Sequence, residues 1–245
     1  MGTDFIPISF KAAAQADPAA KLYYNDFSLE FNSNKTDSAV KIVKLVQNAG
    51  LRIDGVGFQG HMVVGQTPPQ SALMTVLNRF TALGVEVAFT ELDVRHRLLP
   101  ASSTALEQQA MDYVSVVGAC LAIAKCVGVV VWEFTDKYSW IPGTFPGTGE
   151  ACLFDANMSR RPAYTSVSSL LAAAATGSVQ NDVNKSNFTN KAGSTGTGTI
   201  PIPTNGTIAT SKPTNTRAFT DAGSSLRTDL SLCLGILGLL VLVFS

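Results

Sequence analysis

Charged residues are scarce in this chain of 245 residues, and neither sign dominates. Lysine and arginine number 18, aspartate and glutamate also 18, and charged residues make up only 15% of the sequence. A protein that binds nucleic acid usually carries an excess or a patch of positive charge. We therefore expect no nucleic-acid partner.

Histidine and cysteine are also rare, with two and four residues respectively. Cys120 and Cys126 lie too far apart for the C-x2-C spacing of a zinc site, and no pair of histidines accompanies them. We expect no metal and no cofactor. A disulfide between Cys120 and Cys126 is favoured instead, because other features indicate an oxidising compartment. Cys152 has no evident partner, and Cys233 lies in an apolar tail.

The composition divides the chain into three parts. Residues 1–175 alternate apolar runs with helical patterns, as a globular domain does. Residues 176–221 are rich in Ser, Thr, Asn, Gly and Pro, with few large apolar residues. Such a segment buries too little surface to offset its ordering entropy, which predicts a disordered linker. Residues 222–245 end in an apolar run.

The segment 222–245 has the pattern of a glycosylphosphatidylinositol (GPI) anchor signal. Small residues at 222–225 precede a short polar spacer and an apolar run at 230–245. This run is shorter than the roughly 20 residues of a membrane-spanning helix. Small residues, spacer and apolar end together favour anchor attachment at Gly223 or a neighbour. A tail-anchor helix is the alternative, and both place the protein at a membrane.

The first ten residues offer no basic and apolar regions of a secretory signal peptide. A GPI signal acts only on a chain inside the secretory pathway, so we expect the natural chain to begin upstream of Met1. We expect the protein to be secreted or held at the cell surface. Sequons for N-glycosylation, which agree with secretion, begin at Asn34, Asn157, Asn184, Asn187 and Asn205.

Strand and helix patterns alternate in the first 175 residues, which predicts a parallel sheet. Strands are expected at 21–25, 53–58, 85–90 and 127–134, and helices at 5–16, 34–49, 67–83, 102–125 and 161–175. Asn34 or Thr36 is expected to cap the second helix, and Ser102 or Ser103 to begin the fourth. Thr67 and Pro68 are expected to begin the third of these helices as its cap and first residue. Gly50 and Gly84 are expected to end the second and third helices in the left-handed conformation.

Polar or aromatic groups lie at the end of every expected strand. They are Asn25 and Asp26, Gln59 and His61, Glu91 and Asp93, and Trp132 and Glu133. In a (β/α)8 barrel the active site is built at these strand ends. The pattern therefore predicts an α/β barrel with a site at this rim. His96, between two arginines, is expected to be a solvated loop residue.

Four runs in this sequence resemble strands five to eight of glycoside hydrolase family 10, the retaining endo-1,4-β-xylanases. The runs are KLYYNDFSLE (21–30), GVGFQGH (55–61), GVEVAFTELDVR (84–95) and VGVVVWEFTDKYSWIPGTFPG (127–147), and DANMSRRPAY (155–164) also matches. The resemblance implies that residues 1–175 form part of a (β/α)8 TIM barrel. It implies β-1,4-xylan or xylooligosaccharides as the substrate.

The resemblance also implies roles for single residues. A retaining glycosidase uses one carboxylate as nucleophile and a second carboxyl group as acid/base. Glu91 corresponds to the nucleophile, His61 to the histidine that hydrogen-bonds it, and Asp93 to the residue that holds the other nitrogen of this histidine. On the residues alone, Glu91 would be interpreted as a solvated carboxylate at a strand end.

Four more positions match residues that line the family's sugar subsites: Asn25, Gln59, Trp132 and Trp140. Amides donate to and accept from hydroxyls, and indole faces suit the apolar face of a sugar ring. Ordinary core aromatics are the alternative for the tryptophans. The chain departs from the family at Phe27, where tyrosine is usual, and at Glu133, where a small residue is common.

The run that carries the family's acid/base glutamate, at the end of strand four, does not occur in these 245 residues. The resemblance therefore implies a chain with the nucleophile and without the acid, which we expect to hydrolyse xylan negligibly. Open sheet edges are expected near Tyr24 and Val130, with poor solubility as the consequence. The alternative function is a non-catalytic, GPI-anchored protein that binds carbohydrate and derives from a hydrolase.

Overall fold

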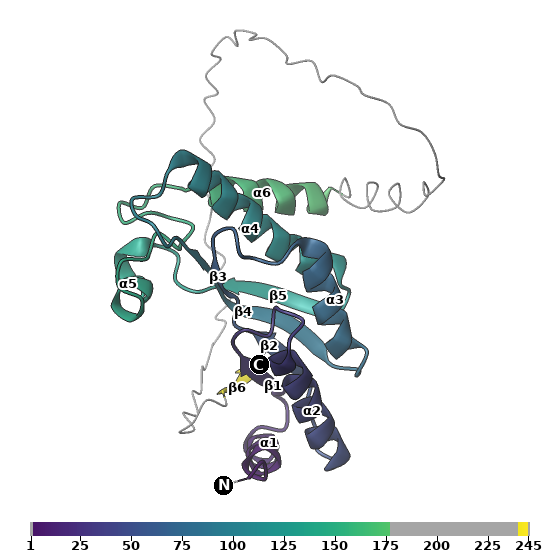
Figure 1. Cartoon of the computed structure of the whole chain (residues 1–245). Helices are drawn as coiled ribbons and strands as arrows, with labels where there is room; N and C mark the ends of the chain where they lie inside the picture. Colours follow the sequence, from purple (N-terminus) through teal and green to yellow (C-terminus); the bar gives the residue numbers. More distant parts are fainter. Residues whose placement is uncertain (1, 177–239, 245) are drawn as a thin grey trace, which may run out of the picture.

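The computed structural model describes residues 2–176 and 240–244 (Figure 1). Gly223, Cys233, the expected linker and most of the expected anchor signal lie outside the described residues. The elements are α1 (Phe5–Ala16), β1 (Lys21–Asp26), α2 (Asn34–Asn48), β2 (Gly55–Phe58), β3 (His61–Val63), α3 (Gln70–Thr81), β4 (Glu86–Arg95), α4 (Ser103–Ala122), β5 (Cys126–Val131), the 3-10 turn η1 (Asp136–Tyr138), α5 (Ile141–Thr144), α6 (Pro162–Ala175) and β6 (Leu240–Phe244).

The strands β1, β2, β4 and β5 pair in parallel and in chain order. A helix follows each of these strands, and α3, α4 and α6 lie on one side of the sheet (Figure 1). Parallel strands that are neighbours both in sequence and in space, each followed by a helix, form an arc of a (β/α)8 barrel. The expected fold, a partial barrel of four strand–helix units, is confirmed.

The core lies between the sheet and the helices that cover it. The ring of Phe58 on β2 lies 5.3 Å from that of Phe80 on α3 and 5.8 Å from that of Phe89 on β4, centroid to centroid. All three side chains are fully buried. This packing fixes the strand register, and with it the position of the residues at the strand ends.

The C-terminal ends of β4 and β5 lie several residues from those expected. β4 runs to Arg95 instead of residue 90, because the short strand β3, which was not expected, pairs with its second half. β5 ends at Val131 instead of residue 134. Its end is set by Glu133, whose φ of 60° turns the chain away from the sheet. Glu91 and Asp93 therefore lie within a strand and not after it.

The start of α3 also differs from that expected. The expected cap at Thr67 was wrong, since α3 begins at Gln70 after Pro69. A residue before a proline avoids the helical conformation, and here two prolines follow Thr67 in succession. The left-handed glycines are confirmed, with φ of 69° at Gly50 and 89° at Gly84.

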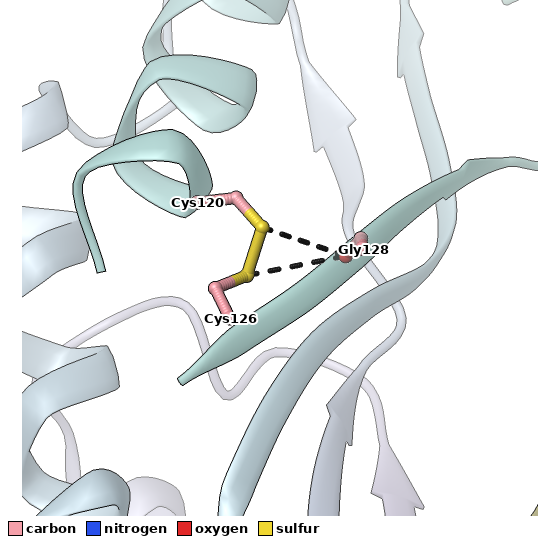
Figure 2. Close-up of a disulfide and its surroundings, with 3 residues drawn as sticks. All are labelled: Cys120, Cys126 and Gly128. Carbon is pink, nitrogen blue, oxygen red and sulfur yellow. Dashed lines mark hydrogen bonds between the residues drawn. A yellow bond between two sulfur atoms is a disulfide. The ribbon is translucent and has the colours of Figure 1, made fainter. Parts of the chain in front are cut away.

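The expected disulfide between Cys120 and Cys126 is present (Figure 2). It joins the end of α4 to the start of β5 with a Cα–Cα distance of 5.2 Å. A helix continued to residue 125 would separate these two Cα atoms by about 9 Å along its axis, too far for the bond. The helix accordingly ends at Ala122.

The two sheet edges differ from one another. The expectation of an open edge near Tyr24 was wrong, because β6 pairs antiparallel with β1 and aligns Val241 with Tyr24. Among the described residues β5 pairs only with β4. Val127 and Val130 of β5 are accordingly 55% and 51% exposed. Within residues 2–176 and 240–244, no helix has the length and apolar character to cross a membrane.

Candidate active site

A cleft of about 420 Å³ opens at the C-terminal ends of the strands. Five of the expected site residues line it, namely Gln59, His61, Glu91, Trp132 and Trp140. Phe27, Ser28, Arg95 and Phe145 complete its wall. The barrel rim thus brings together side chains from β1 to the loop after β5.

Glu91 lies at the floor of this cleft and is 8% exposed. The amide Nδ2 of Asn25 donates to its Oε1 at 3.0 Å, and Nε2 of His61 lies 3.2 Å from its Oε2. Each carboxylate oxygen therefore faces a donor. Hydrogen bonds of this kind stabilise the charged form of a carboxylate, which is the form that acts as a nucleophile.

His61 bridges two carboxylates. Its Nδ1 lies 3.0 Å from Oδ2 of Asp93, and its Nε2 faces Glu91. Burial opposes protonation of the ring, but the hydrogen bonds to Asp93 and Glu91 outweigh it and raise the pKa of His61 to about 9. At neutral pH the ring is therefore an imidazolium that donates to both carboxylates.

Trp140 is fixed by two hydrogen bonds. Its indole Nε1 donates to Oδ2 of Asp93 at 2.9 Å, and its backbone N–H donates to Oε2 of Glu133 at 2.9 Å. Its ring lies 4.8 Å from that of His61, centroid to centroid. Trp132 is 41% exposed, so it is not a core aromatic. The two indoles present their rings to the cleft beside Glu91.

Asn25 differs from its expected role on the cleft wall. Asn25 is fully buried, so its amide is not available to a sugar. Its Nδ2 donates to Glu91, and its Oδ1 accepts from Oγ1 of Thr90 at 2.7 Å. The absence of a side chain at Gly57 makes this possible, because a Cβ there would lie 2.2 Å from Oδ1 of Asn25. Asn25 therefore positions Glu91 from beneath.

The burial of two further residues was not predicted from the sequence. His96 was expected to be solvated but is 2% exposed, and its backbone exchanges hydrogen bonds of 2.9 and 3.2 Å with Gly149. Glu30, which the sequence did not single out, is buried and accepts from the N–H of Gly60 at 2.7 Å. Burial raises the pKa of Glu30. Only the fold reveals these roles, because His96 and Glu30 have no neighbouring residue pattern that indicates burial.

Within the described part of the chain, no three side chains of His, Cys, Asp and Glu are arranged to hold a metal ion. The chemistry available in the cleft is that of a buried carboxylate oriented by an amide and an imidazolium beside two indole rings.

Known proteins similar to this chain were found by sequence and by structure. Endo-1,4-β-xylanase 5 of Pyricularia oryzae is 65% identical over 175 residues, which cover 71% of this chain and 43% of that protein. Endo-1,4-β-xylanase 1 of Humicola insolens is 62% identical over 171 residues, which cover 70% of this chain and 40% of that protein. The chain thus spans less than half the length of these relatives.

Solved structures of xylanases are also similar to this chain. The endo-1,4-β-xylanase XylE of Penicillium canescens is 38% identical with a TM-score of 0.67, over 71% of this chain and 52% of that one. Xylanase 10B of Thermotoga petrophila, solved with xylobiose, is 34% identical with a TM-score of 0.67, over 70% and 52%. A model of glycosyl hydrolase family 10 matches residues 1–170. Since this match covers more than half of the chain, the chain belongs to glycosyl hydrolase family 10.

Proposed function

We propose that this chain supplies the nucleophile half of a retaining endo-1,4-β-xylanase active site, with Glu91 as the nucleophile. The observation that carries the proposal is the position of Glu91 at the floor of the cleft, held by Asn25 and His61 and flanked by two indoles. The xylanases to which the chain is similar, one of them solved with xylobiose, support β-1,4-xylan or xylooligosaccharides as the substrate.

In the proposed reaction the carboxylate of Glu91 attacks the anomeric carbon of a xylosyl residue and forms a glycosyl-enzyme ester. The bond to the leaving sugar breaks, and its oxygen takes a proton from a general acid. Water then hydrolyses the ester with inversion, so that the overall configuration is retained. His61 and Asn25 hold the carboxylate of Glu91 in position and Asp93 holds His61, while Gln59, Trp132 and Trp140 contact the sugar.

We infer that the proton donor of this site is not among the described residues. Asp93 and Glu133 are further carboxylates next to the indoles, but Oδ2 of Asp93 accepts from the indole of Trp140 and Oε2 of Glu133 accepts from its backbone N–H, so both are engaged in holding this loop. We therefore expect this polypeptide by itself to hydrolyse xylan negligibly. The nucleophile alone still suffices for a substrate whose leaving group needs no proton.

An activated substrate tests this directly. A dinitrophenyl β-xylobioside with fluorine at C2 carries a phenolate leaving group, and the fluorine slows hydrolysis of the ester. The 245-residue chain is expected to release dinitrophenolate in about one equivalent and to gain one 2-deoxy-2-fluoroxylobiosyl unit on the peptide that contains Glu91, as measured by mass spectrometry.

Two variants serve as controls. Glu91→Gln keeps the shape of the side chain and is expected to abolish labelling, whereas Glu107→Gln, on the exposed face of α4, is expected to label like the unmodified chain. Labelling of another residue, or labelling that persists in Glu91→Gln, would contradict the proposed nucleophile.

A second function is compatible with the missing acid. A cleft that keeps Gln59 and both indoles could bind xylooligosaccharides at a cell surface without cutting them. This alternative predicts binding that is lost in Trp132→Ala and in Gln59→Ala, without release of reducing ends. It also predicts no transfer of xylobiose to Glu91, which distinguishes it from the first function.

We also propose that the protein is held at the cell surface by a GPI anchor attached at Gly223 or a neighbour. The support is the order of small residues, polar spacer and apolar run in 222–245. Attachment there would remove β6, which lies within the cleaved segment, and free the edge of β1. Release of the protein from expressing cells by a phosphatidylinositol-specific phospholipase is the expected result. Retention after that treatment would favour a tail-anchor helix.

A further inference from the structure

Arg95 has no polar partner although it lies on the wall of the cleft. Its guanidinium carbon lies 4.0 Å from the ring centroid of Phe145, so the side chain is held against an aromatic face. Within residues 2–176 and 240–244 this guanidinium makes no hydrogen bond and no ion pair. Arg161, by contrast, pairs with Asp136 at 2.7 Å and with Glu150 at 3.2 Å.

The environment of Arg95 makes an unpaired charge costly. The side chain is partly buried, and this burial lowers the pKa of Arg95 despite the opposing influence of the nearby Asp93. The Oδ2 atom of Asp93 accepts from Trp140 and faces His61, and its buried Oδ1 has no hydrogen-bond partner among the described residues, so Asp93 attracts Arg95 without pairing with it. A desolvated cation without a partner is unfavourable, so an anionic group bound in the cleft would offset this cost.

The geometry of the Arg95 guanidinium indicates which anion it would bind. A guanidinium presents a planar row of donors that matches the two oxygens of a carboxylate. Among substituents that a β-1,4-linked xylan chain could carry, a uronic acid supplies a carboxylate. The ring of Phe145 keeps the guanidinium on the cleft wall, which reduces the entropy lost when a ligand binds.

On β4, Arg95 lies four residues after Glu91, the proposed nucleophile. Side chains alternate along a strand, so Glu91, Asp93 and Arg95 share one face, with about 13 Å between the Cα atoms of residues 91 and 95. The side chains of Glu91 and Arg95 line the same cleft. The positive charge of Arg95 offsets that of a carboxylate bound to it, and the protonated His61 offsets the charge of Asp93, so repulsion from Glu91 is reduced.

We propose that Arg95 binds the carboxylate of a uronic acid side group, so that this cleft prefers acidic xylooligosaccharides over neutral ones. The inference rests on the proposed function, since it assumes that the xylan backbone occupies the cleft beside Glu91. It adds a selectivity that Glu91, His61 and the two indoles do not by themselves provide.

Binding to the immobilised 245-residue chain tests the proposal. Three ligands with the same xylose backbone are compared: a neutral oligosaccharide, one bearing a single glucuronic acid, and the methyl ester of the latter, which has the same shape without the charge. The acidic ligand is expected to bind about tenfold more tightly than either of the others at low ionic strength, since a charge-assisted pair is about that strong.

The variants Arg95→Gln and Arg97→Gln remove the same charge from positions two residues apart, and Arg97 is exposed and does not line the cleft. Arg95→Gln is expected to abolish the preference, measured as the ratio of the affinities for the acidic and the neutral ligand, while Arg97→Gln retains it. Equal binding of the three ligands, or a preference that survives Arg95→Gln, would overturn the inference and leave the proposed function standing. Failure of every ligand to bind would overturn both.

Discussion

At the scale of single residues, His61 couples the charge of the site to the stability of the fold. Its pKa is raised from 6.5 to about 9, so its stabilising contribution is complete below about pH 6.5 and is lost as the pH rises through about 9. The size of this contribution is on the order of 3 kcal/mol. Unfolding by urea is expected to require progressively less denaturant between about pH 7 and about pH 10.

The control for this pH dependence is His61→Gln, which can still donate one hydrogen bond but does not titrate. This variant is expected to be less stable near neutral pH and to lose most of the alkaline decline. If the unmodified chain and His61→Gln lose stability in parallel over that interval, the imidazolium does not bridge Glu91 and Asp93.

Gly57 gives a second prediction at this scale. A Cβ at this position would lie 2.2 Å from Oδ1 of Asn25 and 2.9 Å from Cγ2 of Thr90, both buried. Gly57→Ala is expected to reduce the free energy of unfolding by about 1–3 kcal/mol through overpacking. It is also expected to displace Asn25 and thereby slow the labelling of Glu91.

Gly128 on β5 offers the matched substitution, since a Cβ there meets no atom within 4 Å. Gly128→Ala is expected to leave both stability and labelling nearly unchanged. Equal effects of the two alanines in urea unfolding would show that the contact with Asn25 is unimportant.

The sequence predicts some of these residues and not others, for a physical reason. Glu91 and Asp93 are spaced two apart on one strand, which places both on the face of the rim, and the resemblance added His61. The burial of Asn25, Glu30 and His96 depends on neighbours 30 or more residues away, such as Glu91 for Asn25 and Gly60 for Glu30. No local pattern encodes such contacts.

At the scale of elements, strand and helix order was predictable, but boundaries set by tertiary pairing were not. An apolar run ends near residue 90, yet β4 continues to Arg95 because β3 supplies backbone partners for its second half. The strand β3 is three residues long, too short to show an alternating pattern. The pairing extends the rigid strand beneath Glu91, Asp93 and Arg95, so it matters for the site.

The disulfide at the turn from α4 to β5 makes a testable contribution at this scale. The loop between Cys120 and Cys126 is short, so its closure is expected to stabilise the fold by about 2 kcal/mol. The double variant Cys120→Ser and Cys126→Ser should unfold at correspondingly lower urea concentration. Reduction with dithiothreitol should have the same effect on the unmodified chain and none on the variant.

Cys152 provides the comparison for this experiment. It is a free, buried thiol, and burial raises its pKa, so it is neutral and unreactive near neutral pH. Cys152→Ser is expected to leave the response to dithiothreitol intact. A loss of that response in Cys152→Ser would mean that the disulfide forms with a different partner.

At the scale of the whole molecule, the arc of four parallel strands leaves the barrel open beside β5. Val127 and Val130 are half exposed, and apolar cavities of about 580 and 440 Å³ are lined in part by residues of this strand. In a closed barrel, neighbouring strands would cover such surfaces. An exposed strand edge with apolar faces favours association with another chain.

The relatives indicate which chain would fit, because they are more than twice as long as the matched region. A polypeptide with the first four strands of the Pyricularia oryzae xylanase would present the complementary edge and, by family resemblance, the acid/base glutamate. Refolded together, the two polypeptides are expected to elute as a one-to-one complex that hydrolyses xylan. Each alone should show negligible turnover, and this chain alone should self-associate.

The variants separate assembly from chemistry in that experiment. Val130→Lys places a charge at the open edge of β5 and should weaken both self-association and the complex. Glu91→Gln should assemble normally and yet abolish hydrolysis, because retaining chemistry needs a nucleophile as well as an acid. Ordinary xylan turnover by the 245-residue chain as a monomer would contradict the division of the site between two halves of a barrel, since one carboxylate would then suffice where the mechanism requires two.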